Sequence, residues 1–129
     1  MEDLDSVADF VTVYITEAHA QDEWPIGSRH RYNQPTTLAE RAAVATKFVE
    51  EYAYRGRLLL DPIGPDAAAA LAALVETISD NPFEREYAAW PLRLHVLHAG
   101  RLAMVGSPVD ASYLLSSVRA AVAAALSGQ

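Results

Sequence analysis

The sequence contains no cysteine among its 129 residues. Disulfides, thiolate metal sites, iron–sulfur clusters and a cysteine nucleophile all need a thiol, so this chain cannot form any of them from its own residues. Hydroxyl, imidazole and carboxylate chemistry remain open. A catalytic site in this chain would therefore be built from histidine, glutamate, aspartate or tyrosine.

Long apolar segments and clustered positive charge are also missing. No apolar run approaches the roughly 18 residues that cross a bilayer, and the opening segment MEDLDSVADF has neither the basic nor the apolar region of a signal peptide. Ten Lys and Arg stand against 17 Asp and Glu, for a net charge of −7, whereas nucleic-acid binding needs clustered cations. We therefore expect a cytoplasmic protein that binds neither membranes nor nucleic acid.

Strand-like and helix-like patterns alternate along the chain. Apolar and β-branched runs predict strands over residues 10–15, 57–61, 92–98 and 101–105, the last two joined by a tight turn at Ala99-Gly100. Apolar residues at helical spacing predict a short helix over residues 2–9, a helix from Thr37 to near Gly56, one opening at Pro65-Asp66 and one over residues 110–127. Residues 16–36 are predicted as a long loop and residues 87–91 as a turn. This order predicts one α/β domain over residues 1–129, with helices packed on a mixed sheet.

The start of the first long helix carries a capping box. Thr37 is followed three residues later by Glu40. In such a pair the hydroxyl accepts from the amide of the glutamate, and the carboxylate accepts from the amide of the threonine. Thr37 is therefore the expected N-cap.

Residues 13–24, which read VYITEAHAQDEW, are similar to the pattern V-Y-I-x-E-A-H-x-x-D-x-W of iodothyronine deiodinases. His30-Arg31, residues 38–43 and residues 87–97 resemble further stretches of that family, and the match spans most of residues 7–106. The resemblance implies a thioredoxin-like fold whose strand with the selenocysteine or cysteine motif would precede Met1. The expected architecture is a truncated thioredoxin-like mixed sheet with flanking helices and a C-terminal β-hairpin plus helix.

The strand that the resemblance places before Met1 would lie centrally in the sheet, between residues 10–15 and 92–98. Unpaired buried backbone groups are costly, so either those two strands close up or another chain supplies the pairing. Exposed sheet edges are templates for association. We therefore expect a homodimer or a larger assembly formed through sheet edges.

Polar side chains gather just after the first predicted strand, where sites in α/β sheets are usually found. A histidine near a carboxylate can shuttle protons near neutral pH. The resemblance implies that Glu17, His19 and His30 line the family's substrate pocket. We predict these three residues as catalytic, with His19 as the proton shuttle; the alternative for Glu17 and His19 is a structural role at the end of the strand.

Substrate binding is assigned to residues around that cluster. Trp24 and Tyr32 would form an aromatic wall, Asp22 would assist, and Arg93 would clamp a carboxylate or phenolate; the resemblance likewise implies that Arg93 binds an anionic group. The carboxylates and histidines are of the types that bind metals, but they lack the fixed spacing of a motif such as HExxH. We predict no metal and no cofactor.

Three hypotheses about this chain remain open. The favoured one is a small non-redox enzyme that performs acid–base chemistry (cyclisation, isomerisation, dehydration or hydrolysis) on a small anionic or aromatic molecule. The second is a non-catalytic module, derived from a thioredoxin-like fold, that binds a ligand or a protein. The third is that the gene start is misassigned and an upstream segment carries the redox motif.

Overall fold

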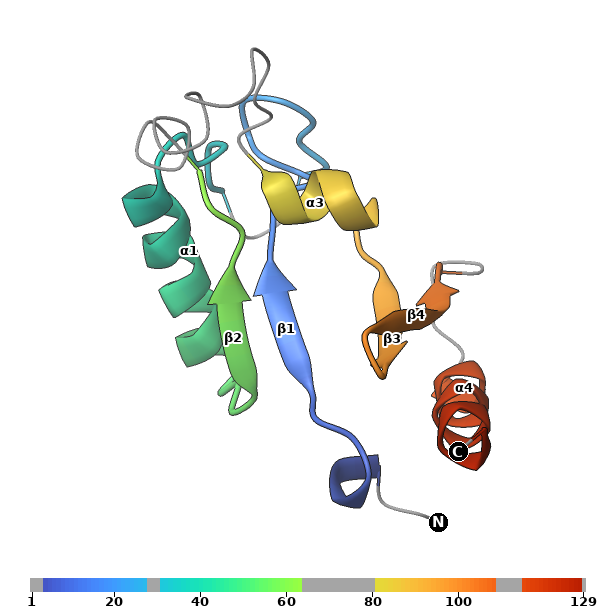
Figure 1. The fold of residues 1–129 in the computed structure, drawn as a ribbon. Coiled ribbons are helices and arrows are strands. Elements are labelled where there is room, and N and C mark those ends of the chain that lie inside the picture. Colours follow the sequence, from blue (N-terminus) through green and yellow to red (C-terminus); the bar gives the residue numbers. More distant parts are fainter. Residues whose placement is uncertain (1–3, 28–30, 64–80, 109–114, 129) are drawn as a thin grey trace, which may run out of the picture. The chain divides into compact units, whose positions relative to one another are not determined.

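The computed structural model describes residues 4–27, 31–63, 81–108 and 115–128 (Figure 1). They fall into two compact units, Val11–Pro91 and Met1–Phe10 with Leu92–Gln129, and each unit is described by itself. The helix predicted to open at Pro65-Asp66 lies outside the described residues, as does the candidate His30. The described elements are mixed helices and strands, which confirms the predicted α/β class.

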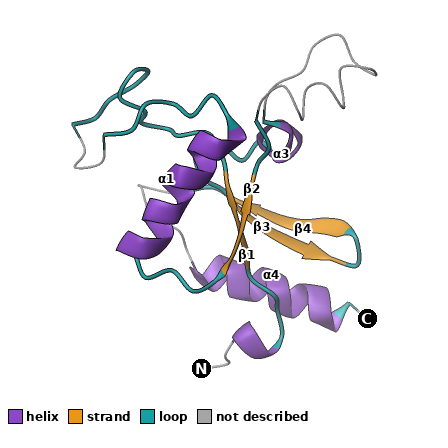
Figure 2. Ribbon diagram, turned by 90° about the vertical axis from the view of Figure 1, so that its left-hand side faces the viewer, coloured by secondary structure: helices purple, strands orange, loops and turns teal. Residues whose placement is uncertain are grey.

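In the unit Val11–Pro91, two parallel strands pack against one long helix. Strand β1 (Val11–Tyr14) pairs with β2 (Arg57–Leu60) in parallel, from Val11 opposite Arg57 to Tyr14 opposite Leu60. Helix α1 (Leu38–Glu51) lies beside the strands (Figure 2). Side chains alternate along a strand, so Thr12 and Tyr14 share the face toward α1: the Tyr14 ring packs on Phe48 at 6.1 Å.

Both ends of α1 are closed by local hydrogen bonds. The predicted capping box is present, with Thr37 as N-cap. At the other end, the amides of Ala53 and Tyr54 donate to the carbonyls of Glu50 and Val49, and Ala53 has φ of +46°. This is a Schellman closure with alanine in the place that glycine usually fills. The helix therefore ends at Glu51 and not near Gly56 as predicted.

A buried polar pair joins β2, α1 and the short helix α3 (Pro82–Tyr87). The Asp61 carboxylate accepts from the amides of Phe83 and Glu84, both at 2.9 Å, and so caps α3. Arg41 donates to the Asp61 carbonyl at 2.6 Å and to the Asn81 side chain at 2.7 Å. Arg41 and Asp61 are 1% and 0% exposed. Sequence reasoning did not predict α3, because its cap lies some twenty residues upstream.

The other unit contains the 3-10 turn Leu4–Ser6, a β-hairpin and helix α4 (Leu115–Ser127). Strands β3 (Leu94–His98) and β4 (Arg101–Gly106) are antiparallel and joined at Ala99 and Gly100, which have φ of +49° and +73°. Positive φ at both positions is what a two-residue hairpin turn of the I′ type requires. Helix α4 packs against both strands. The predicted hairpin is confirmed, as is the helix from Leu115 onward.

The described strands form two pairs, β1 with β2 and β3 with β4. The single domain over residues 1–129 and the assembly through sheet edges stay predictions. Within residues 4–27, 31–63, 81–108 and 115–128, no helix combines the length and apolar character needed to cross a bilayer.

We expect the stability of the fold to depend on pH through Glu40. Its carboxylate accepts from the amide and hydroxyl of Thr36 and from the amide of Thr37, which lowers the pKa of Glu40 below its ordinary value of 4.5. A pKa lowered by folding adds stability above the unfolded pKa, and that stability is lost as the pH falls through the folded pKa. The melting temperature of the wild type should exceed that of Glu40→Gln at pH 7, and the difference should close below pH 4.5. A difference that does not shrink as the pH falls from 4.5 to 2 would contradict this assignment.

Removal of the Asp61 charge should destabilise the larger unit strongly. In Asp61→Asn an amide NH₂ faces a backbone N–H donor at α3, so a buried donor loses its acceptor. We expect the free energy of unfolding to fall by about 2–4 kcal/mol, measured by urea denaturation. The exposed Asp9→Asn removes the same charge and should cost less than about 0.5 kcal/mol. Similar values for the two variants would show that the buried network does not hold the fold.

Candidate functional site

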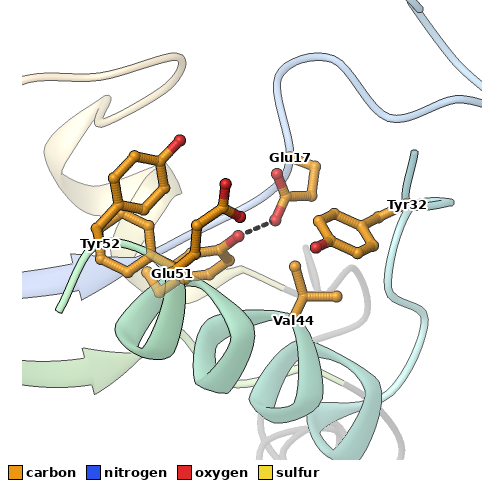
Figure 3. Close-up of a pocket in the computed structure, with 7 residues that line it drawn as sticks. Glu17, Tyr32, Val44, Glu51 and Tyr52 are labelled. Carbon is orange, nitrogen blue, oxygen red and sulfur yellow. Dashed lines mark hydrogen bonds between the residues drawn. The ribbon is translucent and has the colours of Figure 1, made fainter. Parts of the chain in front are cut away.

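A pocket of about 160 Å³ lies between the end of β1, the loop after it and helix α1 (Figure 3). Four aromatic rings, one valine and two carboxylates line it: Tyr14, Glu17, Tyr32, Val44, Phe48, Glu51 and Tyr52. A cavity of about 150 Å³ is large enough to take up benzene. The pocket is therefore sized for one ring or one compact head group.

The local structure explains why these side chains converge. Val44, Phe48 and Glu51 recur at intervals of four and three along α1, which places them on one face of the helix. Tyr14 is the last residue of β1 and faces the same helix. The loop then returns Tyr32 to this place, because the Tyr32 carbonyl accepts from an amide of the opposite limb of the loop at 2.8 Å.

Tyr14 and Glu17 form a hydrogen-bonded pair in the pocket wall. The Tyr14 hydroxyl donates to the Glu17 carboxylate, the bond drawn as a dashed line in Figure 3. Burial raises the pKa of Tyr14 far above its ordinary value of 10.0, and the hydrogen bond and negative charge of Glu17 raise it further. The phenol therefore keeps its proton and acts as a donor, while Glu17 presents an acceptor to the pocket.

The backbone of Glu17 is held by the side chain of Gln34. The Glu17 amide donates to Gln34 Oε1 at 3.0 Å, and Gln34 Nε2 donates to the Glu17 carbonyl at 3.0 Å. The amide group of Gln34 thus bonds both backbone groups of one residue, as a neighbouring strand would. A second hydrogen bond joins the two limbs of the loop, because the backbone N–H of Gln34 donates to the Asp22 carboxylate at 2.8 Å. These bonds fix the position from which the Glu17 carboxylate reaches the pocket.

One buried cation lies within electrostatic range of the pair. Burial lowers the pKa of Arg41, and the charges of Asp61, Glu84 and Glu17 oppose that effect. The guanidinium is committed to Asp61 and Asn81 by hydrogen bonds and does not line the pocket. The lining itself carries acidic groups and, among the described residues, no basic one.

The structure places His19 away from the pocket lining. His19 is exposed, its ring packs on Trp24 at 4.8 Å, and its Nδ1 lies 3.3 Å from the Trp24 carbonyl. Trp24 is itself 58% exposed. The two rings form a contact of their own in the loop, and neither lines the described pocket. Their catalytic and binding roles stay predictions.

The other predicted site residues divide among three environments. Glu17 and Tyr32 both line the pocket. The Asp22 carboxylate instead accepts a hydrogen bond from the backbone N–H of Gln34 in the loop. His30 lies outside the described residues. Arg93 belongs to the other unit, where its guanidinium donates to the carbonyl of Leu92 at 2.9 Å. In the part of the chain that the structure describes, no three His, Asp or Glu side chains gather as metal ligands.

Sequence reasoning missed most of the pocket wall. Tyr14 lies on the face of β1 that packs on α1, as expected from alternation along a strand, and a pocket opens beside it. Phe48 and Glu51 gave no signal apart from their spacing on the helix. Tyr52 follows the last helical residue, so its position depends on the early end of α1.

Comparison with known proteins identifies the family of the chain. The family model described as iodothyronine deiodinase matches residues 1–125. The chain belongs to the iodothyronine deiodinase family. Its deiodinase-like sequence is 29% identical over 106 residues to a type I iodothyronine deiodinase of Xenopus laevis, and 28% identical over 119 residues to a type II iodothyronine deiodinase of Petromyzon marinus. A type II iodothyronine deiodinase of Fundulus heteroclitus is 29% identical over 123 residues.

These alignments cover most of this deiodinase-family chain and a smaller part of each relative. They include 82%, 92% and 92% of the chain, but only 35%, 36% and 41% of the three relatives in the same order. The chain therefore spans less than half the length of the curated deiodinases that it matches. The family model, which matches residues 1–125, spans the pair Tyr14–Glu17 and the α1 face of the pocket.

Loss of the side-chain amide of Gln34 should remove both hydrogen bonds that hold the backbone of Glu17. In Gln34→Leu both backbone groups of Glu17 lose their partner, and we expect the Glu17 amide to exchange its hydrogen at least about tenfold faster, with the free energy of unfolding lower by about 1–3 kcal/mol. Hydrogen exchange followed by NMR measures the first effect. Gln21→Leu is the matched control, because the exposed Gln21 joins the loop through its backbone. Equal exchange in both variants would remove Gln34 as the positioning residue.

Proposed function

We propose that the chain is an acid–base enzyme that acts on a molecule about one ring in size, with the Glu17 carboxylate as proton acceptor. The observation that carries this proposal is the Tyr14–Glu17 hydrogen bond in the wall of a pocket of matching size. A carboxylate fixed by a donor and by a backbone clamp is oriented toward a bound molecule before that molecule arrives. Such preorganisation is what a general base requires.

The proposed step moves one proton and no electrons. Glu17 takes a proton from a C–H or O–H group of the substrate, which leaves a carboxylic acid on the protein and a negative charge on the substrate. The same proton is returned to another atom of the substrate in an isomerisation, or to a departing hydroxyl group in a dehydration. Tyr14 donates a hydrogen bond throughout, since its raised pKa keeps it protonated. No thiol is needed, in keeping with a sequence that has none.

His19 is proposed as the group that exchanges the proton with water. It lies two residues beyond Glu17 and its ring is exposed, and an imidazole changes charge near neutral pH. This role differs from that of Glu17, because His19 does not line the described pocket. Replacement of His19 should therefore slow proton exchange with solvent more than it weakens substrate binding.

A non-catalytic binding module is the second candidate function. The observation that favours it is that Tyr14 and Glu17 satisfy each other, and that the Tyr14 phenol cannot serve as a base near neutral pH. In this case the pocket would bind its ligand without a pH-dependent reaction. The names of the relatives make iodothyronines the first ligands to test for either function.

Proton transfer can be tested without knowledge of the reaction. The wild-type chain should catalyse deuterium incorporation from D₂O into at least one member of a panel of one-ring ketones, enolisable acids, amines and iodothyronines, followed by NMR. Glu17→Gln should lower that rate by about 10²- to 10⁴-fold, because it removes the general base. His19→Ala should lower it as well, with an unchanged dissociation constant for the substrate.

The matched control is Glu50→Gln. Glu50 is exposed on α1 and does not line the pocket, so this variant changes the net charge as Glu17→Gln does and should exchange deuterium at the wild-type rate. Saturable ligand binding with no exchange above the uncatalysed rate would favour the binding module and end the catalytic proposal.

A further inference from the structure

We propose that the pocket selects a positively charged group, an alkyl- or arylammonium, over a neutral or anionic group of the same shape. The inference rests on the proposed function for its location, since both concern the same pocket, but it is a statement about binding and needs no turnover. It departs from the anionic substrate that the sequence suggested together with Arg93.

The pocket wall is built mainly from aromatic rings. Tyr14, Tyr32, Phe48 and Tyr52 line it, and the Phe48 ring lies 6.1 Å from that of Tyr14 and 5.2 Å from that of Tyr52. The face of an aromatic ring carries partial negative charge and attracts cations. Several rings around one small space are the arrangement by which proteins bind quaternary ammonium groups.

The charged groups of the lining have one sign. Glu17 and Glu51 belong to the lining, and in Figure 3 both carboxylates lie toward the space that the rings surround. Among the described residues, the buried cation Arg41 interacts electrostatically with Glu17, but its guanidinium is hydrogen-bonded elsewhere, to Asp61 and Asn81. An anionic ligand would meet two carboxylates and no basic partner among the described lining residues. An ammonium group would find both rings and opposite charge.

The chain already makes such a contact at the edge of this pocket. Lys47 Nζ lies 5.0 Å from the centre of the Tyr32 ring, within the roughly 6 Å at which a cation is attracted to a ring face. Lys47 is on α1 between Val44 and Phe48, and it is exposed. One ring of the pocket thus accepts a cation within the protein itself. This lysine also competes with a bound ammonium, because like charges repel.

The size of the pocket agrees with a compact head group. Its volume of about 160 Å³ corresponds to about five water molecules at the roughly 30 Å³ each occupies in the liquid. A trimethylammonium group or one small ring fills a space of this size. The mouth is bordered by the exposed residues Glu51 and Tyr52, so a substituent on the head group can extend into solvent.

The test compares two ligands of one shape and different charge. Choline has a positively charged nitrogen at its centre, whereas 3,3-dimethylbutan-1-ol has a neutral carbon in the same position. Each ligand is titrated into the ¹⁵N-labelled 129-residue chain. We expect choline to bind about tenfold more tightly than its neutral isostere, with shifts at the amides of the pocket residues. Equal or tighter binding of 3,3-dimethylbutan-1-ol, or tighter binding of benzoate than of choline, would overturn the proposal.

Two pairs of variants make the result specific to the site. Glu51→Gln should weaken choline binding about threefold and leave the neutral isostere unchanged, whereas Glu50→Gln, the neighbouring exposed carboxylate outside the lining, should alter neither. Lys47→Gln should strengthen choline binding, a gain that general destabilisation cannot produce; Tyr52→Leu should weaken it. If the Glu50 and Glu51 variants weakened choline binding equally, the preference for choline would come from the net charge of the chain, and the proposed site would be refuted.

The outcomes separate this inference from the catalytic proposal. Preferential choline binding together with wild-type deuterium exchange in Glu17→Gln would uphold the cation site and refute the general base. Exchange that depends on Glu17, with no preference for ammonium ligands, would uphold the general base and refute the cation site.

Discussion

Burial of one guanidinium beside one aspartate fixes the geometry of the larger unit. A charge removed from water is costly unless hydrogen bonds and opposite charge replace the solvent, so Arg41 and Asp61 must keep their partners in place. Asp61 holds three elements at once, because its amide donates to the Tyr14 carbonyl at the end of β1, its carbonyl accepts from Arg41 on α1, and its carboxylate caps α3. The distance between β1 and α1, and hence the pocket between them, follows from these bonds.

Local chemistry is the part of the fold that could be predicted from the sequence. The capping box at residues 37–40 and the turn at Ala99-Gly100 depend on neighbours in the chain, and both are present. The predicted end of α1 near Gly56 was wrong because Ala53 takes the left-handed conformation at the helix end, a position that glycine usually occupies. Helix α3 was missed for a different reason, since the acceptor of its first amides is the distant Asp61. Hydrogen bonds between residues far apart in the chain produce no periodic pattern in the sequence, so they cannot be predicted from it.

The candidate site shows the same division. Glu17 could be found because it follows a recognisable strand and lies in the motif shared with deiodinases. Its neighbours could not, because the wall of the pocket comes from one face of α1 and from a loop that closes on itself through Gln34. Alternation along β1 puts Tyr14 on the opposite face from Val13 and Ile15, and in the structure that face packs on α1. Alternation does not show whether this face is fully packed or borders a pocket, because that depends on the side chains of α1 and of the loop that face it.

The two carboxylates of the pocket are not equivalent, and their difference reconciles proton transfer with cation binding. A bound cation stabilises the ionised form of a carboxylate beside it and so weakens that carboxylate as a base. One carboxylate cannot serve both purposes well. Glu51 is exposed on α1, where it can face an ammonium group at the mouth, whereas Glu17 is half-buried and bonded to a phenol that keeps its proton. The geometry thus assigns charge recognition to the outer carboxylate and proton transfer to the inner one.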